Sequence, residues 1–75
     1  MVRLSLSQGK EDGVRVGDIV GTVAATAGIP GNTLGRITIQ ERHTLLDVPS
    51  DLVDQVLSDK HNYRIRRRPV TVKRA

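Results

Sequence analysis

The sequence contains no cysteine and no long apolar run. Without cysteine the chain has neither a disulfide framework nor a thiolate metal site, which fits a cytoplasmic protein. The longest uncharged segment, residues 19–35, is interrupted by glycine, proline, threonine and asparagine, so it is not expected to span a membrane. Arg3 follows Met1 closely and no apolar signal-peptide core appears. We therefore expect residues 1–75 to form one small, cytoplasmic domain.

Acidic residues are missing from the C-terminal end. Residues 1–59 carry five basic and eight acidic side chains, whereas residues 60–75 carry seven basic and no acidic ones. The net charge of +4 is therefore an asymmetry within the chain. A basic end on a small domain points first to nucleic acid, and second to an anionic membrane surface or an acidic protein.

Two periodic patterns occupy the N-terminal half. In VRLSLS, residues 2–7, apolar and polar residues alternate as in a half-buried strand. Residues 16–27 then form one apolar helical stripe, and Gly28 is a natural stop for this helix. Gly17 and Gly21 disfavour a helix, and we interpret them as points of close approach to a sheet. The stripe consists of Val16, Ile19, Val20, Val23, Ala24 and Ala27.

Two more strands and a second helix are predicted in the middle of the chain. The strands cover residues 36–40 and 43–48, and the two-residue connection between them implies an antiparallel hairpin. Thr44, Leu46 and Val48 are expected to point inward, which leaves Leu45 exposed on the sheet. The helix is expected to begin at Pro49, Ser50 and Asp51 and to end near Lys60.

The final segment, YRIRRRPVTVKRA, is either a disordered tail or folded structure. One continuous strand cannot bury Ile65, Val70 and Val72 together, because the step from Ile65 to Val70 breaks the alternation. A turn at residues 66–68 followed by an edge strand over residues 69–73 resolves the conflict. The predicted order is βαββαβ: an α+β fold in which two helices cover one face of a four-stranded antiparallel sheet.

No catalytic constellation is apparent. His43 and His61 have no nucleophile signature or closely spaced metal-ligand partner nearby, so we interpret them as surface residues. The segment GIPGNTLG, residues 28–35, looks like a phosphate-binding loop, but it runs from a helix into a strand and lacks a following Gly-Lys-Ser/Thr. We interpret it as a connection whose glycines adopt positive φ angles. The sequence thus indicates a binding domain without metal or cofactor, and not an enzyme.

Four arginines within five residues repel one another, and solubility alone does not require such a concentration. Phosphate contact at this basic turn is therefore the favoured interpretation, and a merely solvated turn is the alternative. The arginines are Arg64, Arg66, Arg67 and Arg68.

Four short motifs, in order, carry a family resemblance from about Val2 to Ala75. The chain resembles the DbpA-type RNA-binding domain found at the C-terminus of bacterial DEAD-box RNA helicases. The motifs are the loop Gly9, Lys10, Asp12 and Gly13, the helix entry Gly17, Asp18, Ile19, Val20 and Gly21, the loop Gly28, Ile29, Gly31 and Gly35, and the pair Val48 and Pro49.

The resemblance implies an RRM-like fold and a role in holding structured RNA, in relatives a ribosomal RNA hairpin. A separate helicase core in the same polypeptide would hydrolyse ATP, with magnesium, and unwind nearby duplex during ribosome assembly. None of that core is in this sequence, so the chain would be part of a larger protein, and monomeric as an isolated domain.

The chain departs from a typical RRM, in which aromatic residues on two strands stack bases. Tyr63 is the only aromatic residue, and the matching outward positions hold Ser5, His43 and Leu45. Since stacking contributes about 1–3 kcal/mol per base, we expect structured RNA to be held through its backbone and shape. The predicted RNA-binding residues are Arg3, Lys10, Arg36, His43, Tyr63, Arg64, Arg66, Arg67, Arg68, Lys73 and Arg74.

A second hypothesis is open at this point. An RRM-like sheet without stacking residues can instead bind a protein partner or self-associate, with weak nonspecific binding of nucleic acid. The expected exposure of Leu45 on that sheet motivates this alternative.

Overall fold

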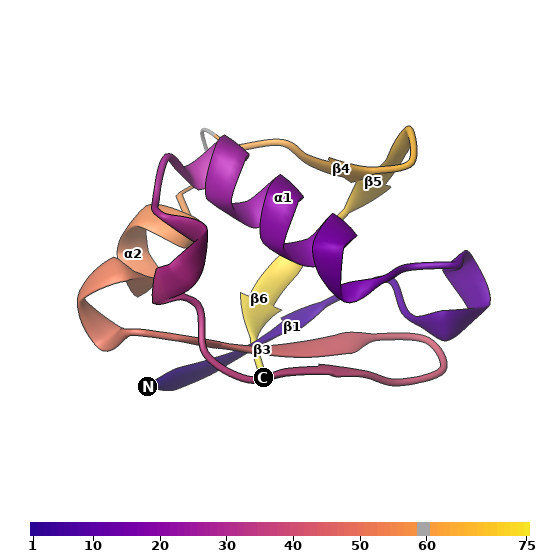
Figure 1. Ribbon diagram of the computed structural model, residues 1–75, viewed down its shortest axis with the longest axis horizontal. Helices are drawn as coiled ribbons and strands as arrows, with labels where there is room; N and C mark the ends of the chain where they lie inside the picture. The colour runs from indigo at the N-terminus through magenta and orange to yellow at the C-terminus, as the bar shows by residue number, and fades with distance from the viewer. Residues whose placement is uncertain (59–60) are drawn as a thin grey trace.

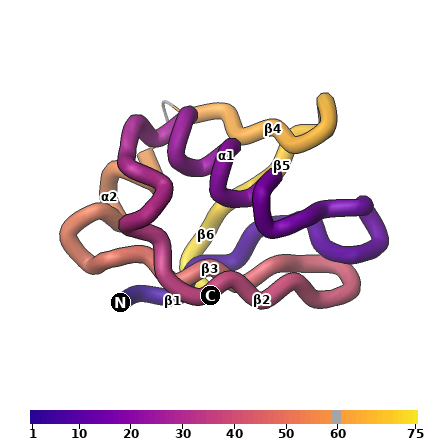
Figure 2. The backbone as a smooth tube through the Cα atoms, viewed as in Figure 1, coloured from indigo at the N-terminus to yellow at the C-terminus, as the bar shows by residue number. Residues whose placement is uncertain are grey.

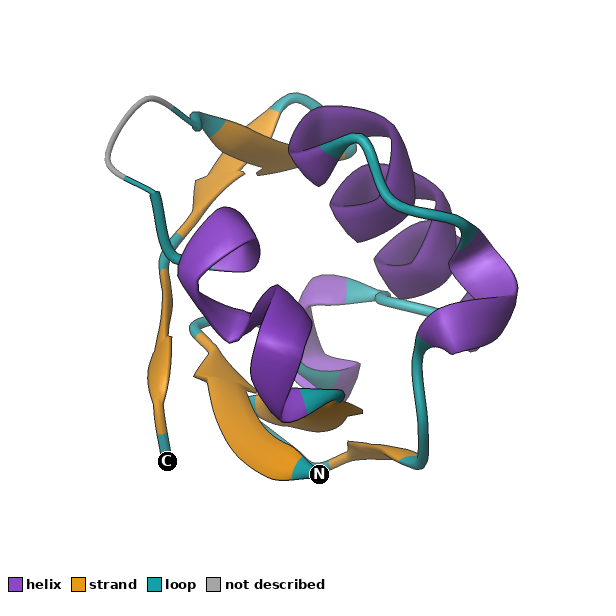
Figure 3. Ribbon diagram, turned by 90° about the vertical axis from the view of Figure 1, so that its left-hand side faces the viewer, coloured by secondary structure: helices purple, strands orange, loops and turns teal. Residues whose placement is uncertain are grey.

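Four strands form an antiparallel sheet in the order β2-β3-β1-β6. The computed structural model describes residues 1–58 and 61–75. Two helices, α1 and α2, lie on one side of this sheet (Figures 1 and 3). This arrangement confirms the predicted α+β sandwich of RRM-like type. The main elements are β1 (Val2–Leu6), α1 (Val16–Ala27), β2 (Ile37–Ile39), β3 (Thr44–Val48), α2 (Val53–Val56), β4 (Tyr63–Ile65), β5 (Arg68–Val70) and β6 (Val72–Arg74), with short 3₁₀ turns at Lys10–Asp12, Gly31–Thr33 and Ser50–Leu52.

Helix α1 begins and ends as its sequence indicates. Asp18 accepts a hydrogen bond from the N–H of Arg15 at the start of the helix, at 3.0 Å. Gly28 ends the helix in the left-handed region, with φ of 71°, and its N–H donates to the Ala24 carbonyl. Gln55 Nε2 donates to the Ala27 carbonyl at 2.7 Å, which ties α2 to the end of α1.

The glycines of α1 were predicted to let the helix approach the sheet closely, and this prediction is wrong. Gly17 and Gly21 are exposed, and a Cβ atom added at either would have no neighbour within 4 Å. They therefore do not bring the helix close to the sheet. Ile19 and Val23 make that contact and are fully buried, whereas Val16, at the start of the predicted stripe, is 51% exposed.

Strand β3 has the predicted register. Thr44, Leu46 and Val48 are buried against the helices. Leu45 points to the other face but is only half-buried, which corrects the prediction that it is exposed. Its cross-strand partners are Ser5 on β1 and Thr38 on β2, and these neighbouring strands cover part of the leucine side chain.

The second helix is shorter than predicted. A 3₁₀ turn, Ser50–Leu52, leads into a single α-helical turn, Val53–Val56. The Val56 carbonyl, which a longer helix would use for its next turn, instead accepts a hydrogen bond from the Tyr63 hydroxyl at 2.7 Å. The predicted helix end near Lys60 lies outside the described residues.

The C-terminal segment is folded, as predicted, but its final strand is divided. Residues 69–73 are not one strand, because the chain passes from one sheet to another at Thr71. There the Thr71 N–H donates to Ser7 Oγ at 2.8 Å, and the Ser7 N–H donates to the Thr71 carbonyl at 3.0 Å. Strands β4 and β5 pair with each other in a separate hairpin beside α1 (Figure 2). Of the three C-terminal strands, β6 alone pairs with β1 in the main sheet.

Most glycines of the segment 28–35 act through close packing rather than through positive φ. Only Gly28 has a positive φ there, so the prediction for the other glycines is wrong. A Cβ at Gly31 would lie 3.0 Å from Val20 Cγ1, and one at Gly35 would lie 3.0 Å from Asp47 Cβ. These approaches leave no room for a larger residue without displacement of the neighbours.

The core lies between the sheet and the helices. Complete burial of one leucine or isoleucine side chain in this core contributes about 1.5–3 kcal/mol to the free energy of unfolding, which is a large share of the stability of a domain of this size. In the described part of the chain, no helix is long and apolar enough to cross a membrane. The fully buried side chains are Leu4, Leu6, Ile19, Val23, Thr44, Leu46, Val48, Val53, Val56 and Ile65.

Candidate nucleic-acid interface

The β4–β5 hairpin displays the basic turn on a fixed support. Tyr63, Ile65 and Val70 point inward and are buried, whereas Arg64 points outward and is exposed. The two residues between the strands, Arg66 and Arg67, both have positive φ angles, of 53° and 68°. The arginines are therefore held on an ordered hairpin, not on a disordered tail.

Two polar side chains tie this hairpin to the body of the domain. Thr22 Oγ1 on α1 donates to the Arg64 carbonyl at 3.1 Å. Gln8, which is 5% exposed, donates from Nε2 to the Pro69 carbonyl at 3.2 Å. The Gln8 carbonyl in turn accepts from Thr44 Oγ1 at 2.8 Å, so the hairpin is connected to the centre of the sheet.

Two of the four clustered arginines form ion pairs with the N-terminal part of the chain. Arg66 Nε lies 3.5 Å from Asp18 Oδ2, and Arg68 Nη1 lies 3.3 Å from Asp12 Oδ1. Each carboxylate is itself held by a backbone N–H three residues earlier in the chain. Exposed pairs of this kind contribute at most about 1 kcal/mol, so phosphates can replace the carboxylates as partners.

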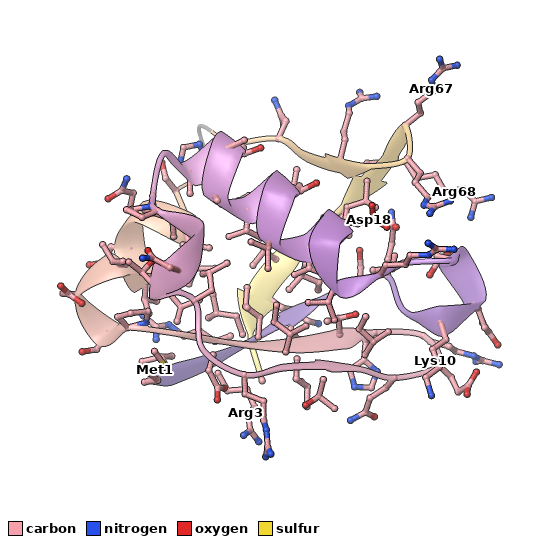
Figure 4. All side chains as sticks on the ribbon, viewed as in Figure 1. Met1, Arg3, Lys10, Asp18, Arg67 and Arg68 are labelled. Carbon is pink, nitrogen blue, oxygen red and sulfur yellow. The ribbon has the colours of Figure 1, made fainter. Side chains whose placement is uncertain are left out.

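The remaining arginines of the hairpin are available to a ligand. Among the described residues, no ion pair or side-chain hydrogen bond involves the guanidinium groups of Arg64 and Arg67. In Figure 4 the Arg67 side chain points away from the body, and Asp18 lies on α1 beneath the hairpin. The side chains offered to solvent here are cationic, which is the chemistry that binds phosphate.

Lys10 lies on a loop that packs against the β2–β3 connection. The Lys10 N–H donates to the Gln40 carbonyl at 2.7 Å. A Cβ atom at Gly9 would collide with the Gln40 carbonyl oxygen and with the backbone of residues 42 and 43, so this approach requires glycine. The close fit fixes the base of the loop and leaves the Lys10 side chain exposed.

The open face of the sheet, on the side away from the helices, is polar and carries one ion pair and an exposed lysine. Arg3 and Asp47 are cross-strand neighbours, and Arg3 Nε lies 3.2 Å from Asp47 Oδ1. The next row contains Ser5, Leu45 and Lys73. Asp47 thus partly neutralises Arg3, a contact that the sequence analysis did not include.

Tyr63 does not lie on the open face. The residue is 6% exposed, and its hydroxyl donates to the Val56 carbonyl at 2.7 Å. The His61 ring contacts it edge-on, with the ring centres 5.9 Å apart. Burial raises the pKa of the phenol above 10.0. These contacts make Tyr63 a core residue, which argues against its predicted role as a stacking group.

The predicted RNA-binding residues fall into separate groups. Arg64, Arg66, Arg67 and Arg68 lie on the hairpin beside α1, whereas Arg3 and Lys73 lie on the open face of the sheet, together with the half-buried His43 at one end. Figure 4 shows Arg3 and Arg67 at opposite sides of the domain. Arg36 precedes β2, and Arg74 lies on the edge strand β6 opposite Leu4. The structure therefore does not bring all of them into one surface.

Sequence reasoning missed the partners that hold the basic hairpin: Gln8, Asp12, Asp18 and Thr22. The positions of Asp12 and Asp18, each three residues after a cap residue, indicate carboxylates fixed by backbone N–H groups. No sequence signal connects them to arginines about fifty residues later. Among the described residues, no group of three or more acidic, histidine or cysteine side chains is placed to hold a metal ion.

Comparison with known families settles the relationship. The model of the DbpA RNA-binding domain matches residues 3–74, which is nearly the whole chain. The chain belongs to this family. The chain is therefore an RNA-binding domain. No curated protein matches the chain.

Proposed function

We propose that this domain holds structured RNA through its phosphate backbone and shape, and that it tethers a DEAD-box helicase core to that RNA. The observation that carries the proposal is the location of the arginines. Arg64, Arg66, Arg67 and Arg68 are exposed on an ordered hairpin, away from the sheet face on which RRM domains usually stack bases.

The composition of the open face supports the same conclusion. Its central row contains threonine, leucine, serine and one lysine but no aromatic residue, and the one aromatic residue of the chain is buried in the core. Each missing base–aromatic stack removes about 1–3 kcal/mol from the binding of a single strand. Phosphate contacts do not need such rings, and a folded RNA presents its phosphates in a fixed arrangement.

The resemblance to helicase-linked domains supports the finer parts of the proposal. A ribosomal RNA hairpin is the proposed ligand, ribosome assembly in the cytoplasm the proposed setting, and the isolated domain is proposed to be monomeric. ATP and magnesium would be bound by the helicase core in the same polypeptide, so this domain would contribute affinity and placement.

A fluorescence anisotropy titration tests the proposal. The domain is titrated with a labelled ribosomal RNA hairpin, a scrambled single strand of equal length and a DNA hairpin of matching sequence, each at several salt concentrations. The proposal predicts the tightest binding to the RNA hairpin, with a preference that persists at high salt. Equal, steeply salt-dependent binding to all three ligands would instead describe a general anion anchor, because counterion release does not depend on sequence.

Absence of binding to all three ligands would favour the alternative hypothesis of a protein-contact module. Sedimentation at several protein concentrations then distinguishes the two functions. A monomer that binds RNA supports the proposed function, whereas concentration-dependent association without RNA binding contradicts it. Leu45, whose expected exposure motivated that alternative, is half-buried and so offers a partner less apolar surface than expected.

A further inference from the structure

The tip of the basic hairpin is a two-residue turn made of two arginines. The strand pairing closes at Ile65 and Arg68, which leaves Arg66 and Arg67 as the connecting residues. Both residues lie in the left-handed region, with φ of 53° and 68°. Two such residues between antiparallel strands form a type I′ turn, whose twist matches the right-handed twist of the hairpin.

Arginine is an unfavourable residue for this turn. In the left-handed region the Cβ atom crowds the following carbonyl oxygen, and type I′ turns therefore favour Asn-Gly and Asp-Gly. Nothing in the described packing compensates for this. Both side chains are exposed, and their one ion pair, Arg66 with Asp18, is 3.5 Å long with an arginine that is 54% exposed. Asparagine or aspartate followed by glycine would therefore make this turn more stable than the two arginines do.

Hydrogen bonds tie both strands of the hairpin below the tip to the body of the domain. Gln8 and Thr22 donate hydrogen bonds to the carbonyls of Pro69 and Arg64, on the two strands of the hairpin. Asp18 draws the Arg66 guanidinium back towards α1, whereas Arg67 projects outward (Figure 4). The two guanidinium groups consequently point in different directions from a fixed backbone.

We propose that Arg66 and Arg67 are the main phosphate-anchoring residues of the domain and that their ligand is a base-paired segment of RNA. Both arginines occupy turn positions at which they lower the stability of the fold. This inference rests on the proposed function and adds the point of contact and the class of RNA. Two cations on the tip of a hydrogen-bonded hairpin suit phosphates that a duplex holds at regular spacing. A single strand would have to be ordered, and the exposed side of the hairpin has no aromatic residue to stack its bases.

The double variant R66N/R67G tests the inference, because it gives the turn its favoured residues and removes both charges. We expect a melting temperature higher by roughly 5–10 °C, since each left-handed arginine is strained. We also expect binding of a short RNA duplex to fall at least tenfold. The slope of log K against log salt should become shallower by about 2, one for each lost phosphate contact.

Two controls separate charge from turn geometry. R66K/R67K keeps both charges and both strained positions, and should retain most of the affinity without the gain in melting temperature. R15Q/R42Q removes two charges from exposed arginines that are not among the predicted RNA-binding residues, and should weaken binding much less than R66N/R67G. Each variant is titrated with the RNA duplex and with one of its strands alone.

The inference is overturned if R66N/R67G binds the duplex as well as the wild-type domain does. A melting temperature that falls in this variant would contradict the argument about turn strain, and tighter binding of the single strand would contradict the assignment of the ligand. In these cases RNA binding by the wild-type domain would still stand. If the wild-type domain bound no RNA at all, the proposed function itself would fail.

Discussion

Replacement of Tyr63 by phenylalanine measures the role of the one aromatic residue. The hydroxyl donates to the Val56 carbonyl at 2.7 Å, and the residue is 6% exposed. Phenylalanine keeps the ring volume but leaves that carbonyl without its donor, which costs about 1–2 kcal/mol. For a domain of this size the melting temperature should fall by roughly 5–10 °C.

Thermal unfolding followed by circular dichroism gives this shift, and RNA titration of a second variant, Tyr63→Leu, completes the test. Leucine removes the aromatic ring, so a tyrosine that stacked on a base would lose about 1–3 kcal/mol of binding energy. If Tyr63 is a core residue, both variants are less stable, and both bind RNA as tightly as the wild-type domain at a temperature where they are folded. Unchanged stability in Tyr63→Phe together with weakened binding in Tyr63→Leu would refute the reasoning.

Three further predictions follow from single contacts. Burial raises the pKa of Tyr63 above 10.0, so the contribution of the neutral phenol to stability is complete below pH 10 and is lost as the pH rises through the raised value. The free energy of unfolding, measured in urea, should therefore fall more steeply with pH in this range for the wild-type domain than for Tyr63→Phe. Gly21→Ala should raise stability by about 1 kcal/mol, because the position is exposed and open; a lower melting temperature would contradict this. Asp47→Asn removes the ion pair with Arg3 and should change stability by at most about 1 kcal/mol and leave RNA affinity nearly unchanged; markedly tighter binding in the titration would mean that the open face holds RNA.

Local patterns in the sequence were sufficient for most of the fold. Alternation identified β1 and the inward residues of β3, and the stripe with its glycine stop identified α1. The division of the final strand was not predictable in the same way. It depends on the mutual hydrogen bonds of Ser7 and Thr71, which are far apart in the sequence.

The candidate site was predictable in composition but not in arrangement. The clustered arginines are visible in the sequence, and the broken alternation between Ile65 and Val70 indicates a turn among them. Their separation from Arg3 and Lys73 follows from tertiary packing, because the hairpin pairs with itself and lies beside α1. Tyr63 was assigned to RNA for its chemistry alone, and its burial against α2 could be seen only in the folded chain.

The most direct test of the account compares two matched neutralisations on the same RNA hairpin. One variant, R66Q/R67Q/R68Q, removes three charges from the basic hairpin, and the other, R3Q/R36Q/K73Q, removes three from the sheet and its border. Glutamine is chosen because glutamate would lie beside Asp12 and Asp18. The account predicts that the hairpin variant loses most of the affinity and that its salt slope becomes shallower by about 2–3, while the sheet variant changes little. The reverse order would contradict it and place the RNA on the open face of the sheet.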